Sequence, residues 1–80
     1  MKFAVAVCCL FANENQIFFV EAANEVEAVK EAFRLKSKPE YKADNELWLA
    51  EFSTDLEQVL QFCFDTENCV AVQRIFWEGK

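Results

Sequence analysis

The chain has 80 residues, 54% of them hydrophobic, and a formal net charge of −6. This length suits one domain, residues 1–80, close to the lower size at which a chain folds without disulfides or metals. The negative charge argues against nucleic acid as a direct ligand, because backbone phosphates bind cationic surfaces. A domain this small cannot hide so many apolar side chains, so we expect some of them to lie at an interface.

The residue types that most catalytic sites need are absent or scarce. The chain has no histidine, the commonest general base and metal ligand in enzymes. Its one glycine, Gly79, lies near the C-terminus, so no glycine-rich loop can bind a phosphate or a dinucleotide. We therefore expect a protein that is not an enzyme, with no cofactor and no metal site.

An apolar run near the N-terminus, residues 3–11, is rich in aromatic and β-branched side chains. Apolar residues occupy both alternating faces of this run, which predicts a central strand covered on both sides. The run could also be the core of a signal peptide, but its composition favours a strand and it is too short to span a bilayer. We expect a cytoplasmic protein with no membrane contact.

The rest of the chain predicts a strand and a helix before one loop, and two strands with a helix between them after it. Residues 17–22 predict a second strand, paired with the first as a hairpin. Asn24 and Glu27 resemble a capping box that opens a helix, which ends before Pro39. After a loop at 37–45, residues 47–52 predict a third strand, Thr54 and Glu57 a second capping box and helix, and residues 69–77 the last strand.

The order β-β-α-β-α-β predicts an α+β fold with a four-stranded, mainly antiparallel sheet and two helices on one face. Two short helices cover only one face of such a sheet. Because the first strand is apolar on both faces, we expect the uncovered face to pair with a second copy of the chain in a homodimer. The predicted self-association residues are Ala4, Ala6, Cys8 and Leu10.

Four cysteines are present, Cys8, Cys9, Cys63 and Cys69. Cys8 and Cys9 are adjacent on a predicted strand and point to opposite faces, so they cannot readily pair. We expect free thiols that pack as small apolar side chains, with a Cys63–Cys69 pair left open. No C-x-x-C motif supports a redox site.

Acidic residues dominate the second half of the chain. Between Asp44 and Glu67 there are seven Asp and Glu and no Lys or Arg. Spaced carboxylates of this kind can imitate phosphates before a basic cleft, although an ordinary solvated surface and helix capping also account for them. The predicted partner-binding residues are Asp44, Glu46, Glu51, Asp55, Glu57, Asp65 and Glu67, with the aromatic residues Tyr41, Trp48 and Trp77.

In size, acidity and lack of catalytic residues, the chain resembles the small acidic proteins with which bacteriophages block host enzymes and defence systems. The resemblance is one of general character and involves no shared motif. It implies a non-catalytic inhibitor or adaptor that binds another protein, including one with a basic nucleic-acid-binding site. Two alternatives stay open: a self-associating assembly module, and a thiol-dependent redox protein.

Overall fold

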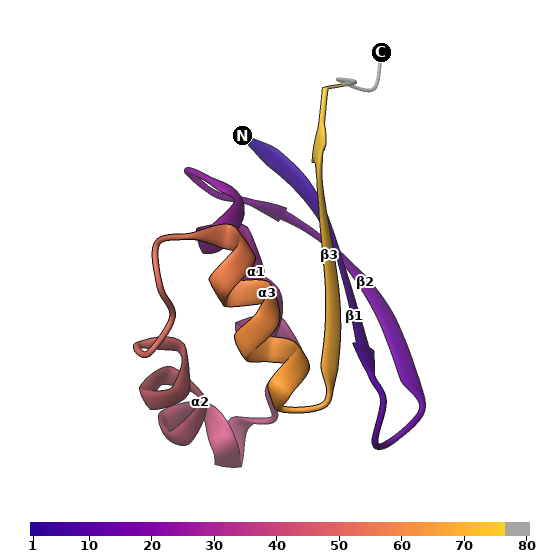
Figure 1. The fold of residues 1–80 in the computed structure, drawn as a ribbon, viewed down its shortest axis with the longest axis vertical. Helices are drawn as coiled ribbons and strands as arrows, with labels where there is room; N and C mark the ends of the chain where they lie inside the picture. The colour runs from indigo at the N-terminus through magenta and orange to yellow at the C-terminus, as the bar shows by residue number, and fades with distance from the viewer. Residues whose placement is uncertain (77–80) are drawn as a thin grey trace.

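A computed structural model describes residues 1–76 and places them in one sheet and one layer of helices. Three antiparallel strands lie in the order β2-β1-β3, and the helices cover one face of this sheet (Figure 1). The elements are β1 (Lys2–Cys9), β2 (Glu14–Glu21), α1 (Glu25–Lys36), a 3-10 helix η1 (Pro39–Tyr41), α2 (Lys42–Leu49), α3 (Leu56–Asp65) and β3 (Asn68–Ile75). The α+β class is confirmed, but the described chain has three strands and three α-helices where four strands and two helices were predicted.

The predicted central strand is β1, which pairs with both other strands. Its register runs from Lys2 opposite Glu21 to Cys9 opposite Glu14 on β2, and from Lys2 opposite Ile75 on β3. Phe3, Val5 and Val7 face the helices and are fully buried. The strand ends at Cys9 and not at residue 11 as predicted, because the chain turns there; Asn13 takes a positive φ of 53°, which asparagine tolerates well.

Helix α1 begins where the sequence predicted. The Asn24 side chain accepts a hydrogen bond from the backbone N–H of Glu27 at 2.9 Å. One stripe of the helix packs on the sheet, with Val29 and Ala32 fully buried and Phe33 nearly so. Arg34 and Lys36 lie in the last turn, where the helix dipole favours cations.

The prediction of a strand over residues 47–52 is wrong. Trp48, Leu49 and Phe52 lie inside while Leu47 is 71% exposed, which is the spacing of a helical face. Trp48 contacts the rings of Phe33 and Phe52, each at a centroid distance of 4.9 Å. Packing against α1 thus stabilises residues 42–49 as the helix α2 (Lys42–Leu49), which a turn follows.

Helix α3 begins one residue later than predicted. The cap is Asp55, whose carboxylate accepts a hydrogen bond from the Glu57 N–H at 2.9 Å, so the predicted capping box at Thr54 is wrong. Ser53 in turn accepts a hydrogen bond from the Asp55 N–H at 3.0 Å and fixes the approach to the helix. Val59 and Cys63 are fully buried against the sheet. Across residues 1–76, no helix has the length and apolar character needed to cross a membrane.

Candidate functional site

The face of the sheet that the helices leave uncovered is the main candidate site. Side chains alternate along a strand, so the residues next to Phe3, Val5 and Val7 point away from the helices. The strand register places their neighbours on the same side. We define the open face as Lys2, Ala4, Ala6 and Cys8 of β1, Asn15, Ile17, Phe19 and Glu21 of β2, and Cys69, Ala71, Gln73 and Ile75 of β3.

The open face carries large apolar side chains on β2 beside small ones on β1. Phe19 is 74% exposed and Ile17 is 64% exposed. They lie directly opposite Ala4 and Ala6, which are half-buried. A ridge of two large side chains therefore stands beside a strip of alanines, and the apolar character continues to Ala71 on β3. Contiguous exposed apolar surface of this kind is typical of a binding site.

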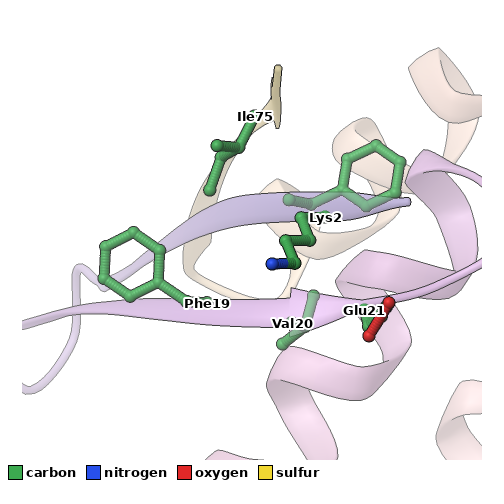
Figure 2. A pocket seen from close by; sticks show the side chains of 6 residues that line it. Lys2, Phe19, Val20, Glu21 and Ile75 are labelled. Atoms are coloured by element: carbon green, nitrogen blue, oxygen red, sulfur yellow. The ribbon is translucent and has the colours of Figure 1, made fainter. Parts of the chain in front are cut away.

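A pocket of 480 Å³ lies at the N-terminal end of β1. Figure 2 shows Phe19, Lys2 and Ile75 around it, contributed by β2, β1 and β3, whereas Val20 points to the other side of β2, toward the helix. Lys2 and Glu21, directly opposite each other, place one positive and one negative charge at this end of the open face. The pocket can take an apolar side chain of a partner and offers it polar contacts at the rim.

Three of the four predicted self-association residues, Ala4, Ala6 and Cys8, lie together on the open face. Leu10 lies beyond the end of β1, in the turn, and is half exposed. Sequence reasoning missed Ile17 and Phe19, which are the most prominent side chains of the face. The signal that could have found them is the alternation along β2, where Ile17 and Phe19 point outward while Phe18 and Val20, the residues that follow each of them, pack inward.

The seven predicted acidic binding residues lie outside the open face, along the helical layer and the turn before β3. Asp44 and Glu46 belong to α2, Asp55 and Glu57 to the start of α3, and Asp65 to its end, with Glu51 and Glu67 in the connections. Glu46 accepts a hydrogen bond from Arg34 Nε at 2.8 Å, and this bond holds the pKa of Glu46 below its ordinary value. Part of the acidic set therefore has a structural role between α1 and α2.

The three predicted aromatic contact residues have different surroundings. Tyr41 of η1 is exposed and available to a partner. Trp48 is half-buried in the aromatic cluster of Phe33, Phe52 and Phe62, where it stacks on Phe62 at 5.6 Å. Trp77 lies outside the described residues.

All four cysteines carry free thiols. Cys63 is fully buried between α3 and the sheet, and burial raises the pKa of this thiol to about 12. Such a thiol stays protonated and is a poor nucleophile. Cys69 lies on the open face, across β3 from Cys63, and the Cys63–Cys69 pair that the sequence left open is not formed.

The raised pKa of Cys63 predicts that stability falls above about pH 9. An unfolded chain ionises this thiol near its ordinary pKa of 9.0, whereas the folded chain keeps its proton up to about 12. The unfolded state therefore holds fewer protons in this window, and the free energy of unfolding decreases with pH. Between pH 8 and 10 we expect Cys63 to contribute a loss of about 1 kcal/mol, measured by urea unfolding. The variant Cys63→Ala should lack this part of the pH dependence; an equal slope in both proteins would contradict it.

Within residues 1–76, no group of three or more Cys, Asp or Glu side chains is arranged to hold a metal ion. Compared with known proteins, the chain matches no family model, no curated protein and no solved structure. The function is therefore inferred from the residues of the chain itself.

Proposed function

We propose that the chain is a non-catalytic binding module that docks its open face on an apolar surface of another protein, as an inhibitor or adaptor does. The observation that carries this proposal is the exposure of Phe19 and Ile17 on a sheet face with no described element over it. Burying a phenylalanine or isoleucine side chain contributes about 1.5–3 kcal/mol each. A partner that covers these two side chains removes them from water, and this free energy of burial then favours binding.

The size and charge of the protein favour a different protein over a second copy as the occupant. Three strands of eight residues give a face of roughly 14 Å by 27 Å. Stable interfaces bury about 800 Å² on each partner, about twice the area of this footprint. The missing area must come from the surroundings of the face, and two copies would each bring a net charge of −6 to that contact.

The acidic helical layer favours a partner with basic groups. No described cation forms an ion pair with Asp44, Glu51, Asp55 or Glu57. Asp55 caps α3 through one carboxylate oxygen, and the other three carboxylates are open to a partner. Carboxylates need not touch a basic partner to act, since their field steers it toward the protein and raises its association rate. The proposal thus includes partners with a basic nucleic-acid-binding surface, the kind of target that small acidic bacteriophage antagonists block.

A pair of matched variants tests the role of the open face. In Phe19→Ser the ridge on β2 is lost, whereas Leu47→Ser removes an equally exposed apolar side chain from α2. Immobilised wild-type protein and the Leu47→Ser control should retain the same proteins from a lysate of the source cells. We expect Phe19→Ser to lose them with an unchanged circular dichroism spectrum. Retention of the same proteins by Phe19→Ser would refute docking through the open face.

The contribution of the acidic residues is tested separately by neutralising them without removing the helix cap. Asp55→Asn keeps a capping side chain and Glu57→Gln keeps the size of the residue. Combined with Asp44→Asn and Glu51→Gln, these changes leave the Arg34–Glu46 ion pair in place. Weaker binding and a smaller salt dependence would support a basic partner, and an unchanged salt dependence would exclude it.

Self-association through the same face is the second candidate function. The observation in its favour is the ridge of Ile17 and Phe19 beside the strip of Ala4 and Ala6. The large side chains of one copy can pack against the small alanines of another. Light scattering after size exclusion, in a reducing buffer at low and high salt, separates the two candidates. A dimer at both salts that Phe19→Ser dissociates would establish self-association, and a monomer would exclude it.

A further inference from the structure

The strand register brings two thiols together on the open face, Cys8 of β1 and Cys69 of β3. They lie directly opposite each other in the β1–β3 pairing. Cys69 is exposed and Cys8 is half-buried, and both thiols are free. Because residues opposite each other share one face of a sheet, nothing separates the two side chains.

The backbone hydrogen bonds fix the spacing of this pair. Leu10 N donates to Glu67 O at 2.9 Å, one step beyond the last pair of the same register. In an antiparallel ladder, hydrogen-bonded and non-hydrogen-bonded pairs alternate, so the Cys8–Cys69 pair, two positions away, is of the hydrogen-bonded kind. Its Cα atoms are then about 5.5 Å apart, near the commonest Cα separation in disulfides.

We propose that Cys8 and Cys69 form a dithiol site that a small disulfide, such as oxidised glutathione, converts to a disulfide bond joining β1 to β3. Bond formation needs the Cβ atoms to move about 1–2 Å closer than in an ordinary hydrogen-bonded pair. The pair lies one residue from the end of β1 and one from the start of β3, where turns follow and precede the strands. Strand ends next to turns yield to such a movement more easily than the middle of a ladder.

The reaction is two successive thiol–disulfide exchanges. The Cys69 thiolate, the more exposed, attacks one sulfur of the small disulfide, forms a mixed disulfide and releases one small thiol. The Cys8 thiolate then attacks the Cys69 sulfur and releases the second small thiol. Two protein thiols lose two electrons and two protons in total, and one small disulfide becomes two thiols.

The geometry makes the site selective among the four cysteines. Cys9 lies on the other face of β1, opposite Glu14 and Asn68. Cys63 is fully buried in the core. Neither lies opposite another cysteine in the sheet, so only the Cys8–Cys69 pair is placed to close.

The bond would join positions 8 and 69 and so close most of the chain into one loop. Constraining a loop of this length in the unfolded state stabilises the folded one, and we expect Tm to rise by about 10 °C or more. This inference concerns the chain alone and does not depend on the proposed binding function.

Incubation of the reduced protein with oxidised glutathione, followed by intact mass and peptide mapping, tests the proposal. We expect a loss of about 2 Da, a linked peptide pair containing Cys8 and Cys69, and the higher Tm. Cys9→Ser and Cys63→Ala should behave as the wild type, whereas Cys8→Ser should stop at the glutathione adduct on Cys69. Stable glutathione adducts on the wild-type protein, a link through Cys9 or Cys63, or no reaction would each overturn it.

Discussion

Replacing Phe3 by alanine should lower the free energy of unfolding by about 3–5 kcal/mol. Phe3 is fully buried on the central strand, where the helices pack on the sheet. Truncation of Phe3 loses the free energy gained by transferring the ring from water to the core. It also leaves a cavity that neighbouring β1 residues cannot fill. Since a domain of this size has a total stability of about 4–12 kcal/mol, this loss is a large fraction of the whole. Urea unfolding followed by far-UV circular dichroism measures the loss.

Phe19→Ala is the matched control, because it makes the same chemical change on the other face of the sheet. Phe19 is mainly exposed, so its truncation should change the free energy of unfolding by no more than about 0.5 kcal/mol. Equal losses in the two variants would show that the open face is covered in solution. A loss for Phe19→Ala that grows with protein concentration would identify a second copy as the cover.

The strongly patterned parts of the chain were predictable from sequence. A long run of β-branched and aromatic residues identifies β1 as the central strand, and Asn24 with Glu27 places the start of α1. These features depend on local chemistry, namely side-chain alternation and a side-chain cap. The uncovered sheet face was also predictable, because few helical residues remain to cover two apolar faces.

Features that depend on contacts distant in sequence were not predictable. The ion pair between Arg34 and Glu46 joins residues twelve apart, and it exists only because α2 packs beside α1. The Cys8–Cys69 pairing requires the strand order β2-β1-β3, which no local pattern specifies. A list of acidic residues likewise does not tell which carboxylate caps a helix or bonds an arginine.

The segment 47–52 shows why a short apolar run is ambiguous. Its composition is that of a strand, since four of its six residues are leucine, tryptophan or phenylalanine. It is also compatible with a helical face of Trp48, Leu49 and Phe52. The ring contacts among Phe33, Trp48 and Phe52 stabilise this helical arrangement. Tertiary packing therefore determines the local structure here.

Leu47 and Leu49 provide an experiment that separates a helix from a strand at this segment. Two positions apart, they share one face in a strand but lie on nearly opposite sides of a helix. Leu49 is almost fully buried and Leu47 is exposed. We expect Leu49→Ala to reduce the free energy of unfolding by about 2–5 kcal/mol and Leu47→Ala to leave it within about 0.5 kcal/mol.

Both variants make the same substitution within one turn of α2, so they differ only in the burial of the leucine that is replaced. Alanine has a higher helix propensity than leucine, so in α2 the Leu47→Ala change carries no local cost. Large and equal losses for both leucines would mean that this segment forms a fourth strand with both side chains on a buried face. A large loss for Leu49→Ala alone excludes that strand and is the result expected of the helical arrangement, in which α2 supplies one buried leucine to the core and presents the other, with Asp44, to the outside.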